Sequence, residues 1–317
     1  MVRKSPKSHL VGSLIAYCAL WVLVPRARFI PAALSDLDSA IKHAHQPWAT
    51  FLTILGIVVL SAATAVFVAV QMWIVYSFSG LRLGFKQSLL WLVGCLAGAG
   101  GIVWLMLWRI DIVGKLHRLP TAAEIVFIVN LMRGTLPSMA LFVLIMLAAA
   151  SLGCMVSLRI KDRNLLLPVV MFAAAIDFWT VTVGPVSHVL AKHPEIVQAV
   201  SAPIPKAGAG AFVPATMMGP GDALFMAVVF AAVFKFGLNG RRNFWFVFAF
   251  VTAAMLAVQM GILPQFPGLV ALAAAVVLAN WGQFRLTRQE KISTAIVGLA
   301  LVASLPLVWR LLGPHGH

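Results

Sequence analysis

Long apolar runs separated by short polar stretches make up most of this chain. Nine runs approach or exceed the length that crosses a bilayer core of roughly 30 Å, which takes about 20 apolar residues in a helix. Because unpaired backbone groups cannot face lipid, each run is predicted to be helical. The runs occupy residues 10–25, 49–78, 87–108, 136–158, 164–183, 212–236, 243–260, 264–282 and 292–312.

A tenth stretch, residues 119–134, is apolar but shorter, and it carries Glu124, Asn130 and Arg133. It is compatible with a span, with a helix at the membrane interface or with a segment that folds back, and the pattern leaves these alternatives open. The pattern as a whole predicts an all-α polytopic membrane protein, a bundle of nine or ten transmembrane helices.

Composition agrees with a lipid-embedded chain. Hydrophobic residues make up 62% and charged residues only 10%, with a mean hydropathy of +0.98. These values lie far outside those of soluble domains, and no polar interval is long enough for a separate core. The net charge of +15 comes from short clusters between apolar runs, which is typical of orientation signals and not of a nucleic-acid-binding patch.

The basic clusters also predict an orientation. The short intervals 159–163 and 235–242 carry three Lys or Arg residues each, whereas the longer interval 184–211 carries only two. By the positive-inside tendency, 184–211 is extracytoplasmic, while the side of the N-terminus stays undecided. Compact loops without organelle signals favour a prokaryotic cytoplasmic (inner) membrane.

Two of the nine acidic residues, Asp177 and Asp222, lie in strongly apolar surroundings. An aspartate at membrane depth costs on the order of 3 kcal/mol and by default marks a functional site. Counting helical rise from the predicted helix ends, both lie on the order of 10 to 15 Å below the same membrane face. Helices joined by one loop often pack side by side, so we expect the two carboxyl groups to meet.

Two adjacent carboxyl groups tend to share one proton, which provides an acid and a base in one site. That is the chemistry of an aspartyl protease, in which the pair activates a water against a peptide carbonyl. The structural alternative is that each aspartate only satisfies a backbone or hydroxyl partner within the packed bundle.

The residues Gly219 to Asp222 read Gly-Pro-Gly-Asp, which resembles the GxGD motif of the presenilin and signal peptide peptidase family. The first aspartate, in Ile176 to Trp179, is similar to that family's first catalytic aspartate, although Ile176 stands where the family usually has an aromatic residue. One span later, Leu263 to Pro267 lies in the place of the family's Pro-Ala-Leu motif, with Gln265 and Phe266 replacing Ala and Leu.

The resemblance implies a presenilin-like division into N-terminal scaffold helices (1–163), a catalytic core (164–282) and an added C-terminal helix (283–317). It implies an intramembrane aspartyl protease without metal or cofactor, whose partners are transmembrane or signal-peptide segments of other membrane proteins. The oligomeric state stays open. The site residues it implies are catalytic Asp177 and Asp222, with substrate contacts from Gly219, Gly221, Pro264, Gln265, Phe266 and Pro267.

Two other functions remain possible on the same residues. A proton-coupled transporter or channel would use the aspartates as a proton relay, and a catalytically silent homologue would bind substrates without cutting them. The Pro- and Gly-rich stretch 201–214 is expected to be either a flexible linker or a gate before Asp222. His188 and His193 lie five residues apart, a spacing that does not favour a metal site.

Overall fold

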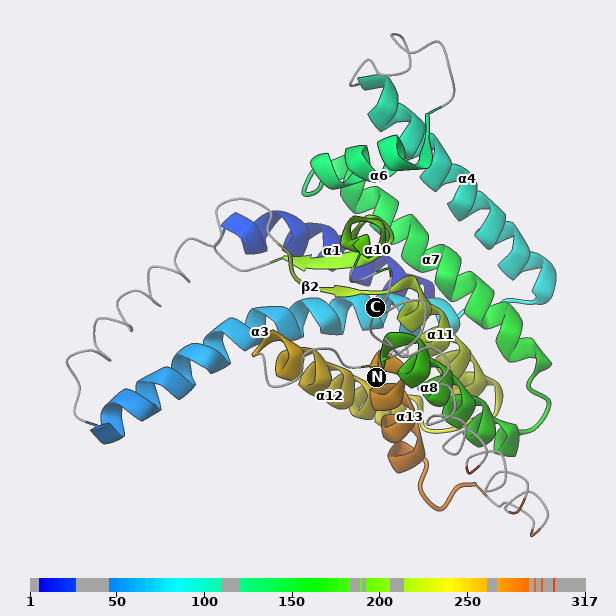
Figure 1. The fold of residues 1–317 in the computed structure, drawn as a ribbon. Helices are drawn as coiled ribbons and strands as arrows, with labels where there is room; N and C mark the ends of the chain where they lie inside the picture. The colour runs from blue at the N-terminus through cyan, green and yellow to red at the C-terminus, as the bar shows by residue number, and fades with distance from the viewer. Residues whose placement is uncertain are drawn as a thin grey trace, which may run out of the picture.

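The computed structural model describes residues 6–26, 46–109, 120–182, 192–205, 214–260 and 267–284, and the single residues 189, 288, 292 and 299. These residues form a helical bundle with one small antiparallel sheet (Figure 1). The helices are α1 (Pro6–Arg26), α3 (Gln46–Ser79), α4 (Phe85–Arg109), α6 (Ala122–Leu131), α7 (Leu136–Arg159), η1 (Arg163–Leu165), α8 (Leu166–Thr182), α10 (Pro194–Val200), α11 (Pro220–Lys235), α12 (Gly240–Gln259) and α13 (Gly268–Ala279). The strands are β1 (Ala202–Pro205) and β2 (Pro214–Met218).

Five helical segments in the described part of the chain are long and apolar enough to cross a membrane. They are α1, α4, α7, the continuous η1 and α8, and α12. The prediction of a helical multi-pass membrane protein therefore holds at this level. The count of nine or ten spans stays a prediction, because α11 and α13 are shorter and the expected span 292–312 lies outside the continuous described segments.

The expected span 212–236 is not one helix, which corrects the prediction. Helix α11 begins only at Pro220 and, with 16 residues, is about 24 Å long, shorter than a bilayer core. Strand β2 precedes it and pairs with β1, from Ala202 opposite Met218 to Pro205 opposite Pro214. Proline at the first helical turn explains the switch, since its fixed φ opens a helix and its missing N–H costs nothing there.

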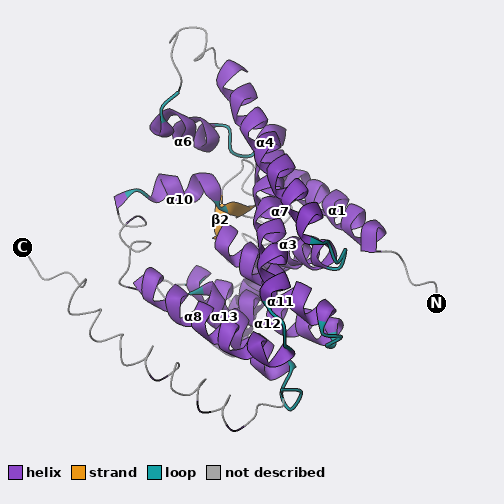
Figure 2. Cartoon of the chain, turned by 90° about the vertical axis from the view of Figure 1, so that its right-hand side faces the viewer, coloured by secondary structure: helices purple, strands orange, loops and turns teal. Residues whose placement is uncertain are grey.

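The doubtful stretch 119–134 contains a helix of 10 residues, about 15 Å long, which is half of a bilayer core. Thr121 and Glu124 start this helix α6 with a capping box: the Glu124 carboxylate accepts from the Thr121 backbone N–H at 2.7 Å. Glu124 thus has a structural explanation. Figure 2 shows α6 and α10 on the same side of the bundle.

Helix α11 lies at the centre of the bundle and packs against α7 and α3. Its residues Met226 to Phe230 are all buried, as expected for a helix that is apolar all round. Gly153 of α7 permits the close approach, because a Cβ there would lie 2.2 Å from the Leu224 carbonyl oxygen. Small residues at a helix crossing are the usual means of tight packing in lipid.

One end of the bundle gathers most of the basic side chains. His9 of α1 stacks on Trp73 of α3, Lys235 of α11 donates to the Ile160 carbonyl after α7 at 2.7 Å, and Arg242 of α12 donates to Leu278 of α13. These contacts bring the N-terminal ends of α1 and α12 and the C-terminal ends of α3, α7, α11 and α13 together. We call this the basic end; among described residues it carries Lys7, Arg82, Lys86, Arg159, Lys161, Arg163, Lys235, Arg241 and Arg242.

A reciprocal amide pair joins α12 to α13 near the basic end. Asn243 donates to the Asn280 side-chain oxygen at 3.0 Å, and Asn280 donates back at 2.7 Å. Each amide also donates to a carbonyl of its own helix, from Asn243 to Asn239 and from Asn280 to Val276. Both side chains are fully buried, so each amide provides the other with a hydrogen-bond partner that apolar surroundings do not offer. It fixes the position of α13, whose other end reaches the two aspartates.

Replacing either asparagine by alanine should destabilise the fold by about 1 kcal/mol, because the remaining buried amide loses its partner. The double variant Asn243→Ala/Asn280→Ala should cost less than the sum of the single variants. The free energy of unfolding of each variant is measured by circular dichroism as the share of denaturing detergent in mixed micelles is increased. Strictly additive losses would show that the two amides do not stabilise each other.

Candidate functional site

Asp177 and Asp222 line the same cavity, which has a volume of about 640 Å³. Asp177 lies on α8 and Asp222 on α11, and each side chain is half-buried. Both carboxyl groups lie next to Gly268 and Leu269, the first two residues of α13. Asp177 lies 11 residues from the start of α8 and Asp222 lies 13 residues from the end of α11, about 16 and 20 Å from the basic end.

Asp222 occupies the first turn of α11, not the middle of a long helix as expected. Its carboxylate accepts a hydrogen bond from the Gly219 backbone N–H at 3.1 Å. The first turn of a helix favours a negative charge, because its free N–H groups carry partial positive charge. Gly219 and Gly221 flank the aspartate, and both line the cavity. The substrate contacts that the resemblance implies for these glycines stay a prediction.

Asp177 is held by the N-terminal end of α13. The Leu269 backbone N–H donates to Asp177 Oδ2 at 2.9 Å. This helix begins directly after Pro267, its N-cap residue, so its first turn offers N–H groups without an intrahelical partner. Pro264, Gln265 and Phe266 of the predicted substrate-binding set lie outside the described residues.

Gly268 is the point at which α13 approaches the second carboxyl group. A Cβ at this position would lie 2.6 Å from Asp222 Oδ1, closer than any real contact allows. The backbone of Gly268 and Leu269 therefore contacts both aspartates. Neither residue was in the predicted site. A glycine directly after the proline that opens a predicted helix is the signal that identifies a close backbone approach.

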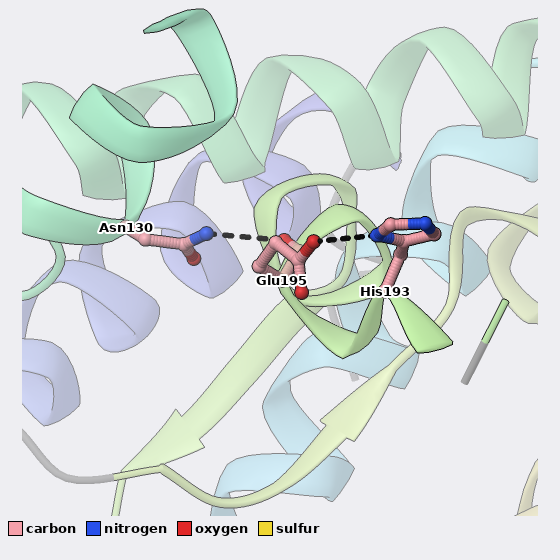
Figure 3. Close-up of polar contacts among 3 residues, drawn as sticks. All are labelled: Asn130, His193 and Glu195. Atoms are coloured by element: carbon pink, nitrogen blue, oxygen red, sulfur yellow. Dashed lines mark hydrogen bonds and ion pairs between the residues drawn. The ribbon is translucent and has the colours of Figure 1, made fainter. Parts of the chain in front are cut away.

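Helix α10 lines one side of the cavity through Ile196, Val197 and Val200. It is anchored to α6 by Asn130, which donates to the Glu195 carbonyl oxygen at 3.0 Å (Figure 3). Arg133, just after α6, donates to the Gln198 carbonyl oxygen at 2.7 Å. The polar residues that made 119–134 a doubtful span thus hold a helix over the cavity.

The carboxylate of Glu195 closes the first turn of α10. It lies 3.1 Å from the His193 Nδ1 atom, and hydrogen bonds from its own backbone N–H and from His193 hold the pKa of Glu195 below its usual range (Figure 3). His193 is thereby accounted for by a structural contact. Within the described residues, no group of three histidine, cysteine or acidic side chains is arranged to hold a metal ion, and His188 lies outside them.

The hairpin of β1 and β2 corrects the expectation of a flexible linker before Asp222. All four residues of β1 are buried, and Thr216, Met217 and Met218 of β2 line the cavity. Non-helical backbone at membrane depth is tolerated where it is buried in protein, and β1 meets this condition. Residues 206–213, between the strands, lie outside the described part.

A second cavity of about 520 Å³ opens on the other side of Asp177, between α8 and α11. It shares Asp177, Gly221 and Leu269 with the first cavity. Its remaining lining is almost wholly apolar and includes Phe172 and Ile176, which are 49% and 41% exposed. The aspartate site is therefore bordered by an apolar groove on the outer face of the bundle.

Sequence comparison adds no family assignment to this geometry. No protein-family model, curated protein or solved structure matches the chain. The function of the site has to be inferred from its own residues: two carboxyl groups, two glycine-flanked helix starts, a strand and an apolar groove, all meeting at one cavity.

Proposed function

We propose that this chain is an intramembrane aspartyl protease that cleaves transmembrane or signal-peptide segments of other membrane proteins. The observation that carries the proposal is the meeting of Asp177 and Asp222 at one cavity inside an apolar helical bundle. A carboxyl pair serves peptide hydrolysis because one proton shared between the two groups supplies both a base and an acid.

The reaction needs only water and this pair. The ionised carboxylate takes a proton from a water whose oxygen attacks the carbonyl carbon of the substrate. The protonated carboxyl donates to the carbonyl oxygen, which carries the developing negative charge. As the tetrahedral intermediate collapses, the C–N bond breaks and the departing nitrogen receives a proton from the pair. Both products leave, and the pair again holds one proton.

Strand β2 supports binding of an extended substrate next to the carboxyl groups. Prolines at 203 and 205 remove two N–H donors from β1, whereas Thr216, Met217 and Met218 of β2 keep theirs. Among the described residues this sheet has two strands, so the outer edge of β2 has no strand paired to it, and β2 ends beside Gly219 and Asp222. A substrate that unwinds locally would pair with this edge by strand addition.

The apolar groove between α8 and α11 supports access from the lipid. A transmembrane substrate diffuses within the bilayer, so it has to reach the site sideways. The groove is lined by apolar side chains compatible with lipid and leads to Asp177, where the first cavity begins. Water would reach the two aspartates through the first cavity, which is bordered by the β1–β2 hairpin and by α10.

The resemblance to presenilins and signal peptide peptidases fits this proposal. The residues Pro267, Gly268 and Leu269 differ from Pro-Ala-Leu only in the middle, and Gly268 and Leu269 contact the aspartates. The positive-inside tendency predicts that the basic end faces the cytoplasm, including the start of α1. We propose the prokaryotic inner membrane as the location on the compact loops alone.

The two aspartates are tested with isosteric variants, because asparagine keeps the oxygen acceptors used by Gly219 and Leu269. Purified Asp177→Asn and Asp222→Asn proteins should each cleave a labelled single-pass peptide at least about a hundredfold more slowly than wild type. Peptide binding should persist. Asp162→Asn is the matched control, since that carboxylate only caps η1 through the Asn164 N–H.

The same assay separates the other functions. Cleavage that survives either aspartate substitution would refute the protease proposal. Peptide binding without cleavage by the wild-type protein would identify a silent homologue. Proton flux into proteoliposomes that is lost in both variants, in the absence of any cleavage, would favour the transporter.

Gly268→Ala tests whether the approach of α13 positions the pair. The added methyl group would displace Asp222 or the start of α13, and a shift on the order of 1 Å at reacting groups costs about a hundredfold in rate. We expect cleavage to fall by that order while the protein stays folded by circular dichroism. Gly100→Ala is the control, because a Cβ there meets nothing within 4 Å. Equal rates for Gly268→Ala and wild type would contradict the positioning role.

A further inference from the structure

A third cavity, of about 930 Å³, lies at the basic end of the bundle, away from the aspartates. Its walls come from α1, α3, α11 and α12, with Trp73, Tyr76, Phe234, Phe244 and Trp245 as the large side chains. Trp73 and Trp245 are 44% and 53% exposed, so the aromatic wall opens onto the surface of the bundle. The volume suits a ligand of many atoms, far larger than a single ion.

The aromatic wall is built and rigid. Tyr76 contacts Phe230, Phe234 and Phe244 with ring centroids 5.0 to 5.3 Å apart. The Tyr76 hydroxyl also lies against Gly240, where a Cβ would come within 2.8 Å of it. Such ring pairs are attractive at these separations. The inner part of the wall, Phe230 and Phe244, is therefore part of the folded core.

Two arginines line the rim of this cavity. Arg82 follows α3 and Arg241 lies in the first turn of α12. No acidic side chain lines the cavity, and neither guanidinium group forms a hydrogen bond or ion pair within the described part of the chain. Arg242, by contrast, donates to Leu278 and lies over the Phe246 ring at 5.6 Å.

Both rim arginines occupy unfavourable positions. Arg82 has φ of 51°, the one positive φ among the described non-glycine residues, a backbone conformation that costs free energy for any residue with a Cβ. Arg241 places a positive charge at the positive end of the α12 dipole. Two like charges beside one cavity also repel. A bound anion between them would offset these costs.

We propose that this cavity binds one anionic phospholipid, with its phosphate between Arg82 and Arg241 and an acyl chain along the aromatic wall. The basic end lies where a headgroup layer would be, and Trp73 and Trp245 lie one to two helical turns inward from it, the level of an interfacial aromatic belt. Anionic lipids are enriched at the cytoplasmic surface of membranes, which the basic end is predicted to face. None of the residues that line this cavity takes part in the proposed aspartate chemistry.

The experiment measures lipid binding to the full-length protein by native mass spectrometry. Phosphatidylglycerol and phosphatidylcholine with identical acyl chains are the two probes. Wild type should bind one phosphatidylglycerol on the order of twentyfold more tightly than phosphatidylcholine, about fivefold from each arginine. Arg241→Gln should lose about fivefold in phosphatidylglycerol affinity and less in phosphatidylcholine affinity, because the choline ammonium group offsets the charge of that lipid's phosphate. Arg242→Gln, with the same change in charge one residue away, should leave both affinities unchanged.

Arg82→Gly separates binding from folding. Glycine adopts the positive φ without strain, so thermal stability without lipid should not fall, whereas phosphatidylglycerol affinity should fall about fivefold. Ala69→Trp, which fills the cavity, should weaken both lipids. Equal wild-type affinities for the two lipids, or equal losses in Arg241→Gln and Arg242→Gln, would overturn the proposal. Inorganic phosphate that stabilises the protein as much as phosphatidylglycerol would also overturn it, since the ligand would then be a free anion.

Discussion

The structure depends on one constraint: in apolar surroundings a carboxyl group must find backbone donors or water. Asp222 finds the Gly219 N–H and Asp177 finds the Leu269 N–H, and both donors belong to helix starts with unused N–H groups. Two helices must therefore begin inside the bundle, and α11 and α13 are accordingly shorter than a bilayer core. The free-energy cost of placing carboxyl groups in apolar surroundings is offset because α11 and α13 begin next to them. These two helix starts also border the cavity that the aspartates line.

Helices that are continuous across the bundle could be predicted from sequence to within four residues at each end. The runs 10–25, 87–108 and 136–158 correspond to α1, α4 and α7, because a span of lipid-facing helix needs nothing but apolar length. The two aspartates could also be found, since intramembrane acids are rare enough for each one to require an explanation. They line one cavity, as expected from the similar depths that were predicted for them.

Elements near the site could not be predicted in this way, because their polar groups are satisfied by partners distant in sequence. The hairpin reads as a Pro- and Gly-rich linker until β1 is paired with β2 and buried among helices. Asn130 and Arg133 look misplaced in an apolar stretch until their hydrogen bonds to α10, 65 residues away, are known. Gly268 carries no chemistry of its own, and only the space occupied by Asp222 shows why a side chain is excluded.

Helix α11 borders both the cavity that holds the aspartates and the cavity at the basic end. Its first turn holds Asp222, and its last turns present Phe230 and Phe234 to Tyr76 in the wall of the basic-end cavity. Because α11 is buried from Met226 to Phe230 and packs against Gly153 without spare room, a tilt at one end would also move the other. A lipid that fills the basic-end cavity would therefore oppose such tilting and restrict the position of Asp222 about 20 Å away. The two sites need no chain of polar contacts to influence each other, since one stiff helix contributes to both.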